Sequence, residues 1–322
     1  MSTMMNVFMS FSDAYAPYAG VSLISLLRNC SIPVHFYLLS QDISKENIER
    51  ITHIFTDYPQ ASVDFVHLSA QQLNEVRSIY QDISKPVFHE IVLYRLFVAD
   101  ILPESLNSVL FLDTDILVRG DISDLADLFF NDDIALYAVP DEFRMLDYHR
   151  IHCSPLSHDY FNAGVMFINL SYWRKNSVRK NCFNYLSEDK DSFFFLDQDL
   201  LNLVCATKVG HLHQKYNFFA KHTDLQIVME NVPYNYFDEA LEAKDNPIIV
   251  HFCGRPRPWF KDDKAPYADE WWNYLYDSEW RNTFKPRYSQ GSDLAYYWFW
   301  IKNLRKNLAA LSPFLYKILR RR

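Results

Sequence analysis

The sequence predicts an α/β protein with a doubly wound, Rossmann-like sheet and flanking helices, followed by a C-terminal helical basic tail. Short apolar runs alternate with segments of helical spacing through residues 1–260. The run at residues 108–112 is apolar on both faces, which is typical of a central strand in a parallel sheet. The 322 residues, 49% of them hydrophobic, suffice for a full core.

Each expected element follows from its own pattern. Strands are predicted at the apolar runs, which are residues 6–11, 34–39, 63–67, 108–112, 134–139, 165–169 and 248–252. Helices are predicted at residues 18–27, 44–55 and 90–102, the last ended by Pro103, and a capping box at Ser69 and Gln72 begins another. Ligands of such a sheet bind beyond the carboxyl ends of its strands.

Composition argues against several classes of protein. Six glycines without a GxxxxGK[ST] or GxGxxG motif argue against repeat folds and glycine-built phosphate loops. The net charge of −8 argues against nucleic acid as a partner. The five cysteines form no CxxC pair, and Asp13 interrupts the first apolar stretch, so we expect reduced thiols, no signal peptide and a cytoplasmic protein.

A pair of acids follows the predicted strand at residues 108–112. Asp113 and Asp115 are two positions apart, so in extended backbone both carboxylates point to one side while Thr114 points to the other. Two hard oxygen ligands at a strand end suit Mg²⁺ or Mn²⁺. The alternative is a turn in which an aspartate only caps the backbone.

A histidine and a cationic loop mark a second strand end. His251 adds a nitrogen ligand that favours Mn²⁺ over Mg²⁺, and the donors of Arg255 and Arg257, beside Gly254, suit a diphosphate. A diphosphate near two carboxylates is repelled by about 4 kcal/mol per close pair at an effective dielectric of about 20, and a bridging divalent cation reverses that sign. A structural histidine and an exposed proline-rich loop are the alternatives.

Four blocks of sequence resemble one known family. They are FLDTDILV, DYFNAGVMFINLSYWRK at residues 159–175, FLDQDLLN and HFCGRPRPW at residues 251–259. In order and approximate spacing they resemble the family 8 retaining glycosyltransferases, in particular the bacterial lipooligosaccharide or lipopolysaccharide α-galactosyltransferases and α-glucosyltransferases. The resemblance covers residues 6–259. One DxD is a weak signal, whereas four ordered blocks are a strong one.

The resemblance implies a GT-A type, nucleotide-binding fold, UDP-galactose or UDP-glucose as the donor and a saccharide or glycolipid acceptor, such as the lipopolysaccharide core. It implies that Asp113, Asp115 and His251 hold Mn²⁺, with Mg²⁺ as the alternative. The expected donor-binding positions, from this resemblance and from the two strand ends, are Ser12, Asp13, Tyr15, Arg95, Asp113, Thr114, Asp141, Asn162, Ala163, Gly164, Gly254 and Arg257. The implied catalytic positions are Asp197, Gln198 and Asp199.

Two segments depart from the family's pattern. The family's first loop directs an acid and an amide toward uridine, where this chain has Ser12 and Ala14, with Asp13 as a compensating acid and Tyr15 where the uracil ring is met. The phosphate-binding lysine of the family's HxxGxxKPW block is Arg257 here. This second change keeps the positive charge.

The expected mechanism is α-retaining transfer by front-side attack, in which the leaving phosphate takes the acceptor proton. By resemblance, Gln198 lies beneath the anomeric carbon and Asp197 holds a sugar hydroxyl. Gln198 is a poor nucleophile, because a neutral amide is weakly basic. A covalent intermediate on Asp199 or Asp197 is the alternative route.

Structural roles for single residues, and two other functions for the protein, are the alternatives to this interpretation. Asn162 and Gly164 are compatible with a turn before a strand, and Asp197 or Asp199 with a helix N-cap. A haloacid-dehalogenase phosphatase also places DxD after a strand, but Leu117 replaces its usual Thr or Val. A non-catalytic carbohydrate-binding scaffold would not need the three predicted metal ligands.

The C-terminal region, residues 261–322, is predicted to be separate from the catalytic domain at residues 1–260. Residues 294–322 contain seven basic residues and no acid, after an apolar run too short to span a bilayer. This pattern predicts an interfacial helix that attaches the protein to the anionic inner face of the cytoplasmic membrane. The alternative is a helix packed on the body.

Overall fold

The computed structural model describes residues 4–81, 83, 89–142, 160–188, 193 and 195–288. The predicted membrane-attachment segment at residues 294–322 lies outside these residues, so it stays a prediction. No helix in the described part of the chain is long and apolar enough to cross a membrane.

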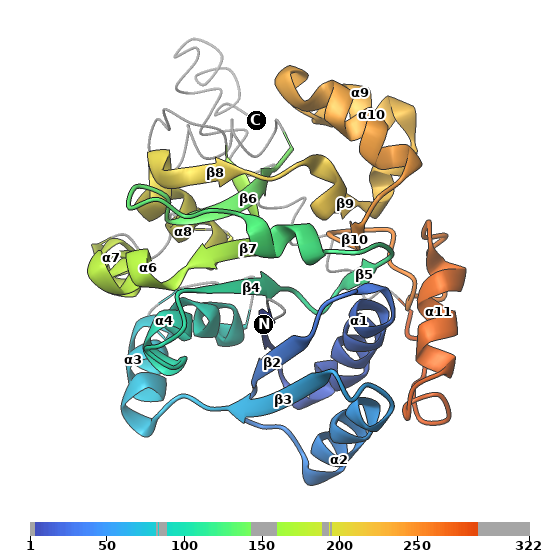
Figure 1. Cartoon of the computed structure of the whole chain (residues 1–322), viewed down its shortest axis with the longest axis horizontal. Coiled ribbons are helices and arrows are strands. Elements are labelled where there is room, and N and C mark those ends of the chain that lie inside the picture. The colour runs from blue at the N-terminus through green and yellow to red at the C-terminus, as the bar shows by residue number, and fades with distance from the viewer. Residues whose placement is uncertain are drawn as a thin grey trace, which may run out of the picture.

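A seven-stranded sheet forms the centre of the molecule, in the order β3-β2-β1-β4-β7-β6-β8 (Figure 1). The strands are β1 (Met5–Ser10), β2 (Val34–Leu39), β3 (Ala61–Val66), β4 (Ser108–Leu112), β6 (Leu136–Pro140), β7 (Phe161–Asn169) and β8 (Val209–His211). The first four pair in parallel, as predicted. Strand β7 is antiparallel to both β4 and β6, so the sheet is mixed, and β4 has a parallel neighbour on one side only.

The run at residues 248–252 belongs to a second sheet, which the sequence did not predict. This three-stranded sheet contains β5 (Ile116–Val118), β10 (Ile249–His251) and β9 (Phe218–Phe219), with β10 in the middle. Strand β10 is antiparallel to β5 and parallel to β9. Because β5 begins three residues after Asp113, the second sheet brings the end of β10 to the end of β4.

Helices cover both faces of the large sheet. The described helices are α1 (Ala16–Asn29), α2 (Lys45–Ile54), α3 (Ala70–Tyr80), α4 (Val98–Ile101), α6 (Leu170–Lys175), α7 (Val178–Glu188), α8 (Asp197–Cys205), α9 (Leu225–Asn231), α10 (Phe237–Asp245) and α11 (Ala268–Tyr276). Helices α1, α2 and α11 share one apolar core, and α3, α4 and α6 to α8 share the core on the opposite face. Alternation along β1 separates the two cores, since Val7 points to the first and Phe8 to the second.

Local signals predicted most helix starts correctly. Ser69 and Gln72 form the expected capping box at α3, and the Ser44 side chain caps α2. The helix predicted at residues 90–102 is instead a 3-10 helix, Glu90–Phe97, followed by the single turn of α4. This tighter winding places Arg95 on the side that faces β7, where its guanidinium donates to the Ala163 carbonyl.

Residues 268–280 pack against α1. The Trp271 ring of α11 lies 5.4 Å from the Trp259 ring and 6.1 Å from the Tyr18 ring, measured between centroids. Trp280 is buried and donates its indole N–H to Asn47 at 2.9 Å. Residues 268–280 therefore share the core of α1, and the predicted boundary at residue 260 remains a prediction.

We predict that Gly20→Ala destabilises the protein although alanine favours a helix by about 1 kcal/mol. A Cβ at this position in α1 would lie 2.2 Å from the Trp280 ring, so the ring must move. We expect a loss of about 1–3 kcal/mol in the free energy of unfolding, measured by urea denaturation. Unchanged or increased stability would show that Trp280 does not pack on this face of α1.

Candidate active site

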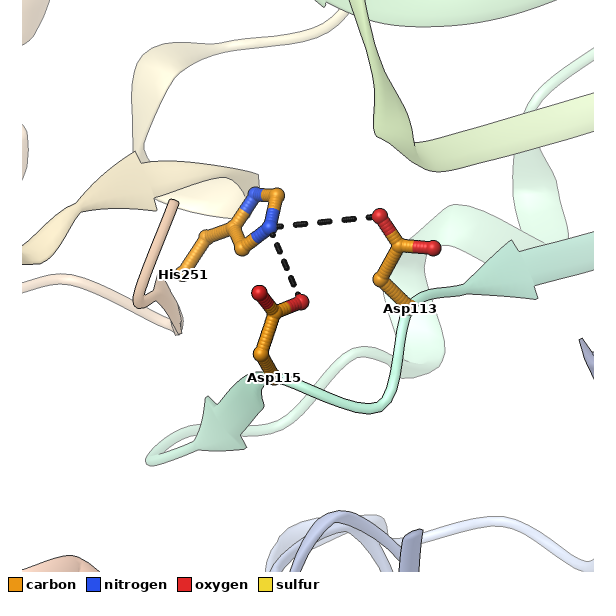
Figure 2. Close-up of side chains that lie close together, drawn as sticks. All are labelled: Asp113, Asp115 and His251. Carbon is orange, nitrogen blue, oxygen red and sulfur yellow. Dashed lines mark ion pairs between the residues drawn. The ribbon is translucent and has the colours of Figure 1, made fainter. Parts of the chain in front are cut away.

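Two carboxylates and an imidazole converge where the two sheets meet. Asp113 and Asp115 lie in the turn between β4 and β5, and His251 ends β10. Figure 2 shows the imidazole of His251 directed at both carboxylates, with its Nε2 3.2 Å from Asp115 Oδ1 and 4.0 Å from Asp113 Oδ2. One ligand atom from each of the three side chains lies within 4.8 Å of the others, and no other such group occurs in the described residues.

The three groups strongly perturb one another's titration. Burial raises the pKa of Asp113, and the like charge of Asp115 adds to this, although Arg95 acts against it. Burial acts most strongly to raise the pKa of Asp115, but the charge and hydrogen bond of the His251 imidazole, together with Arg257, act against it, and the pKa is lowered. Burial acts to lower the pKa of His251, but the charge and hydrogen bond of Asp115, together with the charge of Asp113, act against it, and the pKa is raised. A proton held among these groups is one that a divalent cation displaces on binding.

Arg95 links the acidic pair to α8. Its guanidinium lies 2.8 Å from Asp113 Oδ1 and 3.1 Å from Asp197 Oδ2, and it donates to the Ala163 carbonyl at 3.1 Å. Asp197 is the first residue of α8 and is buried. Burial raises the pKa of Asp197 to about 6. The charge of Arg95 acts against this rise, and the like charge of Asp113 adds to it.

Asn162, Ala163 and Gly164 are strand residues, which excludes the turn that was the alternative at this position. All three lie within β7 and are buried. A Cβ on Gly164 would lie 2.3 Å from Cε1 of His251 and 2.9 Å from Asp113 Oδ2. Only glycine leaves room here for the histidine and the aspartate to approach each other.

The Gln198 side chain uses all its hydrogen-bonding capacity. Its Oε1 accepts from the Ala163 backbone N–H at 2.9 Å and from Asn162 Nδ2 at 3.3 Å. Its Nε2 donates to Asp141 Oδ2 and to the Tyr160 hydroxyl, both at 3.1 Å. Burial, with a contribution from neighbouring Glu142, raises the pKa of Asp141. The amide of Gln198 therefore has one fixed orientation.

The Asp199 carboxylate is completely buried. Its Oδ1 accepts from the Tyr160 hydroxyl at 2.6 Å, and its Oδ2 accepts from the backbone N–H of Phe195 at 2.8 Å. The N-cap of α8 is Leu196, so neither Asp197 nor Asp199 is the N-cap residue considered as an alternative.

The first loop forms a separate patch of contacts. Ser12 precedes a 3-10 turn at Asp13–Tyr15, and Asp13 Oδ1 accepts from the Ser44 backbone and from Asn47 Nδ2, both at 2.7 Å. Asp13 is thus engaged in holding α2. The half-exposed ring of Tyr15 lies 5.2 Å from the ring of Tyr18, which meets the Trp259 ring at 4.9 Å.

The two loop arginines differ in their partners. Arg257 Nη2 lies 3.7 Å from Asp115 Oδ2, and its Nε donates to the Gly254 carbonyl at 2.8 Å. Arg255 instead forms ion pairs with Asp262 and Asp263. Of the two expected diphosphate donors, only Arg257 is ion-paired to the acidic group at the meeting of the sheets. Gly254, with φ +76°, provides the left-handed turn that brings Arg257 there.

Thr114 also has a structural contact. Its side chain is buried, and its carbonyl accepts from the Ser22 hydroxyl of α1 at 2.9 Å. This bond fixes the backbone of the turn that carries Asp113 and Asp115.

Sequence reasoning missed two residues of this site. Tyr160 belongs to the DYFNAG block but was not singled out, although its hydroxyl contacts both Asp199 and Gln198. Asn217, which contacts His251 Nδ1 at 2.9 Å, precedes the two-residue strand β9. No pattern in the sequence marks Asn217, because its partners come from strands distant in the chain.

Comparison with known proteins identifies the family. The sequence profile of Glycosyl transferase family 8 matches residues 6–263. This chain belongs to glycosyl transferase family 8. It is 28% identical to General stress protein A of Bacillus subtilis (strain 168), over 89% of this chain and 98% of that protein. It is 27% identical to a Lipopolysaccharide 1,2-glucosyltransferase of Escherichia coli, over 86% of this chain and 79% of that protein.

Two solved glycosyltransferase structures have a similar fold. The galactosyltransferase LgtC, crystallised with donor and acceptor sugar analogs, superposes with a TM-score of 0.73 at 23% identity, over 87% of this chain and all of that chain. The bifunctional glycosyltransferase WbbM gives 0.71 at 20% identity, and this chain spans about half of it. The predicted α/β fold class, with a Rossmann-like sheet and flanking helices, is confirmed for the described residues. Family 8 membership decides against the haloacid-dehalogenase alternative.

We predict that the stabilising effect of Asp197→Asn depends on pH. Because the folded-state pKa of Asp197 is about 6, above the ordinary 3.8, its ionisation opposes folding as the pH rises from about 4 to about 6. An asparagine carries no such charge, so its advantage in the free energy of unfolding grows over this range and reaches at most about 3 kcal/mol above it. Urea denaturation of the wild type and Asp197→Asn between about pH 4 and 8 measures the difference in their free energies of unfolding. A difference that does not change with pH would contradict the raised pKa of Asp197.

Proposed function

We propose that this protein is a retaining, Mn²⁺-dependent hexosyltransferase that moves galactose or glucose from UDP to a saccharide acceptor, of the kind found in the lipopolysaccharide core. One observation carries the proposal, which is the convergence of Asp113, Asp115 and His251 within 4.8 Å. The E. coli relative, named a lipopolysaccharide 1,2-glucosyltransferase, supports the acceptor class. Similarity to a second named lipopolysaccharide enzyme, the 1,3-galactosyltransferase of Salmonella typhimurium, keeps both hexoses open.

The donor set fits a divalent cation. Two carboxylates and one imidazole suit Mn²⁺ better than Mg²⁺, since Mg²⁺ prefers oxygen ligands alone. Without a cation, the like charges of Asp113 and Asp115 act against each other in a buried site. A bound Mn²⁺ would supply positive charge to the donor diphosphate and stabilise the departing UDP.

The surrounding side chains bind and orient the donor in this proposal. Arg257, whose side chain is partly exposed and whose Nη2 lies 3.7 Å from Asp115 Oδ2, contacts the diphosphate. Asp141 and Asp197 accept hydrogen bonds from sugar hydroxyls, while Arg95 holds Asp197 in place. Gln198 presents a fixed amide to the anomeric carbon, with Ala163 and Asn162 holding its oxygen.

Front-side attack remains the preferred chemistry. The acceptor hydroxyl attacks the face that UDP leaves, and its proton passes to the leaving phosphate oxygen. The burial of Asp199 and its bonds to Tyr160 and Phe195 support this route, because a nucleophile must first be freed from both partners. Asp197 is ion-paired with Arg95, which lowers its nucleophilicity.

The first loop and the C-terminal segment extend the proposal. Tyr15, beside Ser12 and Asp13, forms one wall for the uracil ring, since its ring is half-exposed and joined through Tyr18 to Trp259. Residues 294–322 attach the protein to an anionic membrane surface in the cytoplasm, where a glycolipid acceptor would be found.

A donor screen tests the function. We expect the full-length protein to release UDP from UDP-galactose or UDP-glucose with Mn²⁺ and not with EDTA. Asp115→Asn should lower this rate on the order of 100-fold, because it removes a charged ligand of the proposed cation. Asp64→Asn is the matched control, since Asp64 lies on the exposed face of β3, where its carboxylate is 3.2 Å from His35 Nε2.

The outcomes separate the competing functions. A non-catalytic scaffold would bind a UDP-sugar without releasing UDP. An equilibrium binding measurement beside the measured rate of UDP release detects this outcome. Release that is unaffected by EDTA and by Asp115→Asn would exclude the proposed metal role.

We predict that no glycosyl adduct forms on Asp199. Rapid denaturation during turnover, digestion and mass spectrometry of the peptide containing residues 197–205 should show only unmodified Asp199. We expect Asp199→Asn to cost about 1–3 kcal/mol of stability, because its amide cannot accept from both Tyr160 and the Phe195 backbone. A hexose on Asp199 would establish the covalent route instead.

A further inference from the structure

The hydrogen-bond partners of His251 determine which of its ring nitrogens can bind a metal. His251 Nδ1 lies 2.9 Å from Oδ1 of Asn217, and both residues are buried. The oxygen of an amide accepts hydrogen bonds and its nitrogen donates them, so the neighbours of Asn217 determine its orientation. A chain of hydrogen bonds connects Asn217 to Asn162, and Asn162 to the backbone N–H of Gly164, which can only donate.

The chain starts at Asn162, whose orientation is unambiguous. The backbone N–H of Gly164 donates to one terminal atom of Asn162 at 3.0 Å. A backbone N–H only donates, so that atom is the oxygen, Oδ1. The other terminal atom, Nδ2, lies 3.0 Å from the carboxylate oxygen Oδ2 of Asp141, as a donor should.

Asn162 then fixes Asn217. The Asn162 oxygen lies 2.9 Å from the second terminal atom of Asn217. Because an amide oxygen only accepts, this atom of Asn217 is the nitrogen Nδ2. The oxygen of Asn217 therefore faces His251, and it accepts a hydrogen bond from Nδ1–H.

We infer that Asn217 is a positioning residue that keeps the hydrogen of His251 on Nδ1 and leaves Nε2 to bind the metal. Nε2 is the nitrogen that faces both Asp115 and Asp113. Whether or not Nε2 carries a proton before metal binding, the bond to Asn217 retains the Nδ1 hydrogen, so Nε2 is the nitrogen that becomes a ligand. This inference rests on the proposed metal site. It adds Asn217, the residue before β9, as the side chain that selects the tautomer of His251.

The same chain couples the metal site to the catalytic amide. Asp141 Oδ2 accepts from Asn162 and also from Gln198 Nε2. The Asp141 carboxylate thus orients the amides of Asn162 and Gln198. Asn162 is hydrogen-bonded through Asn217 to His251, and Gln198 lies at the proposed position of the anomeric carbon. Partners of this kind, behind a metal-binding histidine, typically contribute 10- to 100-fold in metal affinity.

The test measures Mn²⁺ binding rather than turnover. Electron paramagnetic resonance of free Mn²⁺, in titrations of the full-length protein without donor, gives the dissociation constant. We expect Asn217→Leu, which has similar volume and no hydrogen bonds, to weaken Mn²⁺ binding about 10- to 100-fold. Asn217→Asp keeps an acceptor for Nδ1–H and should recover most of that loss.

A matched control separates this effect from general damage to the fold. Asn169→Ala also removes a buried asparagine of two hydrogen bonds, but at the far end of β7, where it caps α6. We expect this variant to lower stability and leave the Mn²⁺ dissociation constant within about twofold, since it lies outside any network that reaches His251.

Nitrogen NMR of the imidazole reads the tautomer directly. In the metal-free wild type, His251 should show a hydrogen on Nδ1, and this preference should weaken in Asn217→Leu. Equal Mn²⁺ affinities of wild type and Asn217→Leu, or a wild-type His251 with bare Nδ1, would overturn the inference. Absence of Mn²⁺ binding by the wild type would instead defeat the proposed metal site, while the NMR result would still decide the tautomer.

Discussion

The site depends on a balance of buried and partly buried charges at the meeting of the two sheets. Asp113, Asp115 and Asp197 contribute three carboxylates, and Arg95 and His251 are the buried groups that oppose them. Burying unpaired carboxylates is costly, so each needs a close partner or a proton. The raised pKa values of Asp113 and Asp197 show that this compensation is incomplete. A further positive charge is what the cluster lacks, and the proposed cation supplies it.

The path of the backbone explains why the charges meet at this point. The Asp113 backbone N–H donates to the Gly164 carbonyl at 2.8 Å, and the Phe252 N–H donates to the Asp115 carbonyl at 2.9 Å. The first bond joins the acidic turn to β7, and the second joins it to the end of β10. Both carboxylates are therefore positioned by main-chain bonds from two sheets. Rigid elements hold such a group more precisely than a free loop would.

The sequence was informative where a feature depended on neighbouring residues. The strand at residues 108–112, the acids that follow it and the capping box at Ser69 were predictable because periodicity and spacing are local. The second sheet was not predictable, because the apolar run at residues 248–252 is compatible with a strand of either sheet. Only its pairing with β5 shows to which sheet it belongs. Asn217 was not predictable for the same reason, as its role comes from contacts with Asn162 and His251 across the fold.

The start of α8 shows how one backbone position assigns three roles to three consecutive residues. Leu196 has φ +41°, an uncommon conformation for a residue with a large side chain, and such positions cost on the order of 1–3 kcal/mol. It sets the direction in which the first turn of α8 begins. Successive side chains on a helix diverge by about 100°, so Asp197 meets Arg95, Gln198 meets Asp141, and Asp199 turns toward Tyr160. A rotation of this turn by about 100° would be needed to replace the amide by a carboxylate in the site, and the bond from Tyr160 to Asp199 opposes such a rotation. The strained residue and the buried tyrosine thus act together to keep a neutral group, rather than a nucleophile, beside the donor-binding residues of β7.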